Sequence, residues 1–170
     1  ISRDQVVKLW DINTGKQIKT FSSERDADTF AGLMGDTVTF SPDGKIIAAA
    51  SGDKGLKLWD VNTGKELKTL TGHSISVNSI SFSPDGKTLA STSGSQLKIW
   101  DVSTGKEIKT FDNRSDNVSH GIFSPDGKTI AFAANKSLKL WDTSILQQNK
   151  TFQGHSDSVL NAIFSPDGKT

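Results

Sequence analysis

The chain repeats one motif of about forty residues, and this repetition limits its possible folds more than any other feature. The string Phe-Ser-Pro-Asp-Gly-Lys begins at Phe40, Phe82, Phe123 and Phe164. A Trp-Asp pair recurs at Trp10, Trp59, Trp100 and Trp141, and the last three tryptophans are 41 residues apart. A fixed period of this length is typical of arrays in which each repeat is one small unit that packs on its neighbours.

Each repeat is expected to form four short β-strands. In the copy at residues 72–111, apolar residues alternate over short runs that are separated by turns, which leaves no room for a helix of ordinary length. The predicted strands are residues 76–83, 87–92, 96–101 and 107–111. In the first turn Pro84 fixes φ, and Gly86 supplies the positive φ that the turn requires.

A sheet of this kind carries apolar side chains on both faces, so it needs a neighbouring sheet on each side. Stacking the copies radially around an axis meets this need. The tryptophans and phenylalanines occupy fixed places in each copy, and we expect them to fill the space between adjacent sheets.

Gly72-His73, the Ser-Pro-Asp-Gly turn and Trp100-Asp101 together resemble the WD40 repeat. The resemblance implies an all-β fold, a β-propeller of four-stranded antiparallel blades. The chain holds about four blades' worth: a partial blade at 1–21, blades at about 30–70, 72–111 and 113–152, and a partial blade at 154–170. Because propellers typically have 4 to 8 blades, we expect an open array that belongs to a larger ring or completes itself with another chain.

Composition favours a soluble, cytoplasmic protein that binds neither nucleic acid nor membranes. The net charge is +1, with both signs interspersed along the chain. The absence of cysteine excludes a disulfide framework, and no early apolar run resembles a signal peptide or a membrane span.

WD40 repeats often contain a buried hydrogen-bond chain that links the Gly-His histidine, a second-strand hydroxyl, an Asp of the next turn and the third-strand Trp. Such a chain supplies partners to a buried indole and imidazole. We number the three complete blades, at about 30–70, 72–111 and 113–152, as first, second and third. The matching residues are His73, Ser93 and Trp100 in the second blade, and Ser51, Asp53 and Trp59 in the first. The second blade lacks the Asp, the first lacks the His and the third lacks both hydroxyl and Asp. We therefore expect apolar packing to hold the blades together.

No residue pattern indicates a catalytic, cofactor or metal site. The sequence contains no His-x-x-x-His, cysteine cluster, P-loop or Gly-x-Ser-x-Gly. Four aspartates occupy the same turn of successive repeats and are interpreted as turn formers: Asp43, Asp85, Asp126 and Asp167. Lysines follow both hairpin turns, so one rim is expected to carry Asp and Lys together, which favours solubility.

The resemblance also implies a protein-binding surface. In WD40 proteins, partners often contact the residues that flank the apolar Val of the first strand and those in the turn between the second and third strands. By motif these are Ser76, Asn78, Asn117, Ser119, Ser158, Leu160, Gly52, Gly94 and Asn135. Met34 and Asp36 match less closely, because the first blade lacks Gly-His.

A loop at residues 22–35 is longer than the matching connections of the other blades. It is either an additional contact or a tolerated surface insertion. The predicted contact residues are mostly small and polar, without the Tyr or Trp anchors of many binding hot spots. The surface is therefore expected to bind weakly by itself or to rely on this loop.

We interpret the chain as a non-catalytic scaffold that presents a β-propeller surface to a protein or peptide partner. Two alternatives stay open at this point. One is the sensor or regulatory propeller of a larger bacterial signalling NTPase or kinase, and the other is a propeller-fold hydrolase.

Overall fold

The structure is a computed structural model that describes residues 7–21, 38–51, 54–112, 116–145 and 147–170. The regular secondary structure in these residues consists of β-strands, as the repeat predicts. They are β1 Val7–Trp10, β2 Gln17–Phe21, β3 Val38–Phe40, β4 Ile46–Ser51, β5 Gly55–Asp60, β6 Glu66–Leu70, β7 Ser79–Phe82, β8 Thr88–Ser93, β9 Gln96–Asp101, β10 Glu107–Asp112, β11 Val118–Phe123, β12 Thr129–Ala134, β13 Ser137–Asp142 and β14 Gln147–Phe152.

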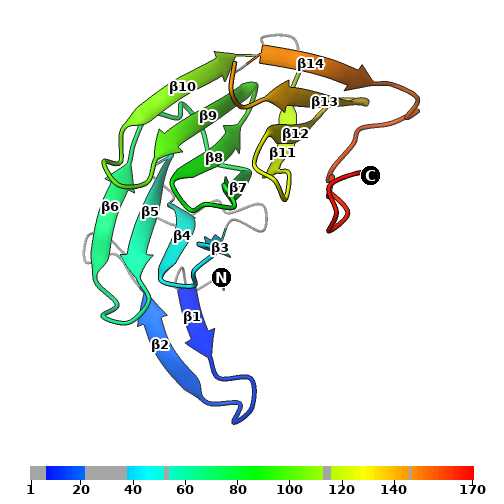
Figure 1. The fold of residues 1–170 in the computed structure, drawn as a ribbon. Helices are drawn as coiled ribbons and strands as arrows, with labels where there is room; N and C mark the ends of the chain where they lie inside the picture. The colour runs from blue at the N-terminus through cyan, green and yellow to red at the C-terminus, as the bar shows by residue number, and fades with distance from the viewer. Residues whose placement is uncertain (1–6, 22–37, 52–53, 113–115, 146) are drawn as a thin grey trace.

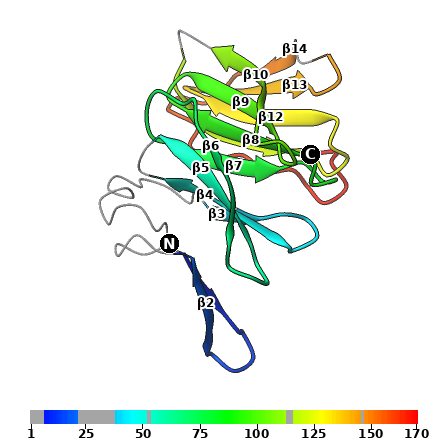
Figure 2. The same cartoon turned by 90° about the vertical axis from the view of Figure 1, so that its left-hand side faces the viewer.

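The strands form three antiparallel sheets of four strands and one sheet of two. Sheets β3–β6, β7–β10 and β11–β14 each follow the order of the chain, and β1 pairs with β2. In Figure 1 the sheets fan around a common centre, with β3, β7 and β11 on the inside of the arc and β2, β6, β10 and β14 on the outside. Figure 2 shows the same sheets from the side. This arrangement confirms the predicted all-β propeller fold.

The Ser-Pro-Asp-Gly turn is closed by the same side-chain bonds in each copy. In sheet β7–β10, Ser83 Oγ donates to Asp85 Oδ1 at 2.6 Å, and the Lys87 N–H donates to the same oxygen at 3.0 Å. The Ser83 bond, followed by the Lys87 bond, lowers the pKa of the Asp85 carboxyl. Equivalent bonds form at Asp43, Asp126 and Asp167. The predicted role of these aspartates as turn formers is confirmed.

The hydrophobic core lies between adjacent sheets. Leu56, Leu58 and Leu70 of sheet β3–β6 pack with Phe82 and Trp100 of sheet β7–β10. Clusters of the same kind fill the seams on either side of this one. Each full sheet therefore buries one face against the sheet before it and, where a sheet follows, the other face against that sheet, which provides the main driving force for folding.

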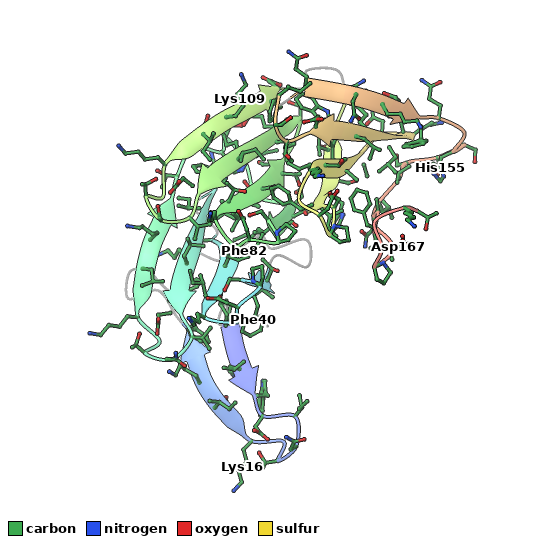
Figure 3. All side chains as sticks on the ribbon, in the orientation of Figure 1. Lys16, Phe40, Phe82, Lys109, His155 and Asp167 are labelled. Carbon is green, nitrogen blue, oxygen red and sulfur yellow. The ribbon has the colours of Figure 1, made fainter. Side chains whose placement is uncertain are left out.

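The prediction that the tryptophans and phenylalanines fill the core is wrong at the ends of the array. Trp59 and Trp100 are 1% exposed, whereas Trp10 is 53% exposed, and Phe40 and Phe152 are exposed as well. In the described residues no sheet precedes β1–β2 and none follows β14. Phe82, which is equivalent to Phe40, packs on a four-stranded sheet, but the pair that precedes Phe40 has only two strands. Phe40 and Phe82 are labelled in Figure 3.

The partial blade predicted at 154–170 should begin with a strand at residues 158–165, as the repeat does elsewhere, and this expectation is wrong. A strand requires a ladder of hydrogen bonds with a neighbour, and no described segment pairs with these residues in that way. The turn that follows still forms, with the Gly168 N–H donating to Ser165 O at 2.8 Å. The first strand of the second full sheet is shorter than predicted, since β7 covers Ser79–Phe82.

Gly121 on β11 allows the inner strands of two sheets to approach closely. A Cβ atom at this position would lie 2.9 Å from Thr92 Cγ2 on β8. Ser79 Oγ on β7 accepts a hydrogen bond from the Gly121 N–H at 3.2 Å and donates to Gly121 O at 3.1 Å. The seam is thus held by polar bonds at its inner edge as well as by apolar packing.

We expect Gly121→Ala to lower the free energy of unfolding by about 1–3 kcal/mol, because the new methyl group overpacks the seam. Urea denaturation of the wild type and the variant measures this change. The double variant Gly121→Ala/Thr92→Ser, which removes the opposing methyl group, should recover part of the loss. Equal losses in the single and double variants would contradict a steric cause.

Candidate partner-binding face

The buried hydrogen-bond chain of the second full blade runs through Ser91. His73 Nε2 lies 2.6 Å from Ser91 Oγ, and Trp100 Nε1 donates to the same oxygen at 2.8 Å. The sequence-based assignment of Ser93 to this role is wrong, because Ser93 Oγ donates to Ile75 O at 2.8 Å instead. Both serines lie on one face of β8, and only the position nearer the middle of the strand faces Trp100.

The neighbouring blades lack this hydroxyl. Ala49 and Phe132 occupy the positions equivalent to Ser91 in β4 and β12. Accordingly, Trp59 Nε1 and Trp141 Nε1 are buried without a hydrogen-bond partner among the described residues. The expectation that apolar contacts dominate agrees with the ring packing, since Phe21 lies 6.3 Å from Trp59 and Phe111 lies 4.1 Å from Trp141, between ring centroids.

The His73–Ser91 pair does not present an accessible nucleophile. Both side chains are buried, and Trp100 donates to the serine oxygen. His73 Nδ1 has no partner in the described chain, so no carboxylate orients the ring. Burial, and secondarily the positive charge of Lys98, lowers the pKa of His73 to about 4. Burial also lowers the pKa of His120.

The predicted contact residues that the structure describes lie on one side of the array, which we call the connection face. It consists of the β8–β9 and β12–β13 turns and the segments at residues 71–78, 116–117 and 153–160. The carbonyls of Gly94 and Asn135, in the two turns, accept hydrogen bonds at 2.7 Å from the Val118 and Val159 N–H groups of the following repeat. The turns are therefore tied to the next repeat.

Two of the predicted contact residues also cross the seams with their side chains. Asn78 Nδ2 donates to Val118 O at 3.2 Å, and Ser119 Oγ donates to Val159 O at 2.7 Å. These positions are equivalent, 41 residues apart. Asn78 and Ser119 are half-buried, so their side chains help to join the repeats.

The remaining described contact residues are exposed on the connection face. Ser76 and Asn117 lie in the segments before β7 and β11, and Ser158 and Leu160 lie after β14. Leu160 is 76% exposed. Gly52, Met34, Asp36 and the loop at residues 22–35 lie outside the described residues.

A groove of about 660 Å³ opens on this face between the β12–β13 turn and the segment after β14. It brings together Asn135 and Ser158, two of the residues that the sequence predicts to contact a partner. Its lining residues are Asp116, Ala134, Asn135, Lys136, Ser137, Gln153, Gly154, His155 and Ser158. Figure 3 shows His155 on the chain that follows β14.

Asp116 organises one wall of the groove. Its Oδ1 accepts a hydrogen bond from Asn135 Nδ2 at 3.0 Å, and its Oδ2 lies 2.6 Å from Lys139 Nζ. Asn135 adopts a positive φ of 49°, a conformation that Asn tolerates better than most residues. Lys136 Nζ donates to Ser156 O at 2.7 Å across the groove.

Sequence reasoning missed Asp116, Lys136 and His155 as groove residues. One signal lay in the outer strands: Glu66 and Glu107 pair with Lys57 and Lys98, but Gln148 stands at the equivalent position of β14. Lys139 pairs with Asp116 instead. The pairing depends on tertiary distances, which the motif alone does not contain.

Other kinds of site find no support in the described part of the chain. No group of three or more His, Cys, Asp or Glu side chains there is arranged to hold a metal ion. The described residues include no helix with the length and apolar character needed to span a membrane.

The chain matches the family described as WD domain, G-beta repeat (WD40), at residues 36–60, 64–101, 105–142 and 146–170. These ranges cover most of the sequence, and the chain therefore belongs to the WD40 repeat family. A comparison with curated proteins finds no matching relative. WD40 repeats generally mediate protein–protein interactions, and WD40 propellers are typically non-catalytic scaffolds.

We expect the stability of the protein to fall as the pH drops from 6.5 towards 4. In this range the unfolded chain protonates His73 while the folded chain does not, so the loss reaches about 3 kcal/mol near pH 4. Urea denaturation at several pH values measures it. The variant His73→Asn should show a shallower pH dependence in this window, and an unchanged slope would contradict the assignment. The turn aspartates, whose pKa values are lowered, begin to lose their stabilising contribution below about pH 5, and they do so equally in the wild type and the variant.

We expect Ala49→Ser to raise the free energy of unfolding by about 1 kcal/mol, because the new hydroxyl gives Trp59 Nε1 an acceptor. The matched control is Ala48→Ser, which buries a hydroxyl on the opposite, apolar face of β4 and should destabilise the protein. Thermal and urea denaturation compare the two. Similar losses for both variants would show that the position equivalent to Ser91 cannot supply the bond.

Proposed function

We propose that the chain is a non-catalytic scaffold that binds a protein or peptide partner through the connection face. The observation that carries this proposal is the convergence of Asn135 and Ser158, which come from successive repeats, on one groove. Its volume of about 660 Å³ is within the range of ligand sites. WD40 repeats generally serve this role, and no observation favours the NTPase- or kinase-linked sensor or the hydrolase.

The chemistry of the groove suits a polar peptide segment. Asn135 donates a hydrogen bond to one carboxylate oxygen of Asp116, and Lys139 donates to the other and compensates the negative charge. Lys136 and His155 add donors, and Ser158 adds a small hydroxyl-bearing side chain at the edge. Because backbone bonds tie the turn to the following repeat, a partner meets walls that are already ordered, which lowers the entropic cost of binding.

The chain contains no cysteine, so a single introduced thiol can carry a photo-cross-linker at one chosen place. We expect a benzophenone attached to Ser158→Cys or Asn117→Cys to cross-link the same partner from an extract of the source organism. Mass spectrometry identifies the partner. Ser158→Arg, which places a long cationic side chain at the groove, should then reduce the affinity for the purified partner at least tenfold.

The matched control is Gln147, an exposed residue of the outer strand β14. Gln147→Cys should give no cross-link to that partner, and Gln147→Arg should leave its affinity within twofold of the wild type. Equal cross-linking from Gln147→Cys and Ser158→Cys, or unchanged affinity of Ser158→Arg, would overturn the proposal.

A further inference from the structure

The rim opposite the connection face carries a second groove. This rim, which we call the hairpin rim, holds the Ser-Pro-Asp-Gly turns and the turns between the third and fourth strands of each sheet. The groove has a volume of about 620 Å³ and lies between sheets β3–β6 and β7–β10. Its lining residues are Ile46, Leu58, Leu67, Lys68, Gly86, Lys87, Asp101, Val102 and Ser103. Both sheets are complete, so the groove is not a product of an unfinished blade.

The floor of this groove is aliphatic. Leu58 and Val102 belong to the cluster that fills the seam, and Ile46 packs against the same cluster. Leu67 on β6 remains 45% exposed at the opening. The Val102 N–H donates to Lys87 O at 2.9 Å and so joins the two turns that form one wall. The groove is therefore an ordered apolar surface.

Two lysines give the opening a positive charge. Asp101 also lies at the opening, but its Oδ1 accepts hydrogen bonds from Ser103 Oγ at 2.7 Å and the Thr104 N–H at 2.7 Å. That carboxylate is thus held by its own turn. Lys68 and Lys87 have no ion pair among the described residues, although Lys87 interacts electrostatically with the neighbouring Asp85. The three charged residues that line the groove sum to +1.

Lys19 on β2 is equivalent to Lys68 on β6, but its ammonium group makes different contacts. Lys19 Nζ donates to Val61 O at 3.0 Å and also to Asn62 O, so its ammonium group is bound to the following turn. Lys68 lies at the matching place on β6, where its stem approaches Gly105. Its ammonium group makes no such bond among the described residues, which leaves its charge available to a ligand.

The next seam lacks the same aliphatic floor. Thr88 and Thr143 stand where the groove has Ile46 and Val102. Thr143 Oγ1 also donates to Gly127 O at 2.9 Å, which turns that position towards the polar turn. Of the two seams between four-stranded sheets, only this one has the aliphatic floor, although both are built from the same repeat.

We propose that this groove binds a peptide segment of a partner protein in which acidic residues flank an aliphatic side chain. The aliphatic side chain covers Leu67 and the floor of the groove, and the carboxylates meet Lys68 and Lys87. Charge complementarity selects an acidic segment, since the positive charges of Lys68 and Lys87 attract carboxylates and repel basic side chains. The proposal does not depend on the connection face, which lies on the opposite rim.

A displayed library of random twelve-residue peptides tests the proposal. The library is selected on the wild-type chain after removal of peptides that bind Ile46→Thr/Val102→Thr. That variant carries the residues of the next seam, where the same fold accepts them. We expect the surviving peptides to combine an aliphatic residue with neighbouring Asp or Glu. Their affinity should fall at least tenfold in Lys68→Glu/Lys87→Glu.

The matched control is Lys109→Glu/Lys128→Glu, which makes the same charge change at the equivalent positions of the next seam; Lys109 is labelled in Figure 3. It should leave the affinity within threefold of the wild type. An equal loss in both charge variants would show bulk electrostatic attraction and overturn the proposal. Survival of basic peptides or of none, or displacement of all bound peptides by decanoate at micromolar concentration, would overturn it as well.

Discussion

The packing of each sheet on the sheets beside it is the interaction on which the rest of this structure depends. A four-stranded sheet with Trp100 on one face and Leu97 on the other cannot bury both faces by itself. Stability is therefore a property of seams between repeats. Trp10, which no described sheet precedes, is exposed, whereas Trp59, which packs on the preceding sheet, is buried.

Polar side chains have different roles on the hairpin rim and on the connection face. On the hairpin rim, side chains such as Asp85 are used within their own turn. On the connection face, Asn78 and Ser119 donate across the seams to the next repeat. Some residues at family contact positions are thus already engaged in joining the repeats, and binding falls to their exposed neighbours such as Ser158.

Small differences between near-identical repeats make their surfaces unequal. Ala49, Ser91 and Phe132 share one position, and only the serine gives the adjacent tryptophan an acceptor. Gln148 replaces a glutamate, and Lys139 consequently pairs with Asp116 beside the groove of the connection face. A partner that binds one repeat therefore does not find the same chemistry on the next.

The spacing of Trp-Asp and Ser-Pro-Asp-Gly determined the all-β fold, the four-strand unit and the turn role of the aspartates, because turn chemistry and strand alternation are local properties. The sequence also located the face on which Asn135 and Ser158 lie. Only the tertiary structure decided that Ser91 rather than Ser93 bonds Trp100, that residues 158–165 form no strand and that grooves open at two particular seams. These outcomes depend on distances between repeats and on which neighbours are present, and no single repeat contains that information.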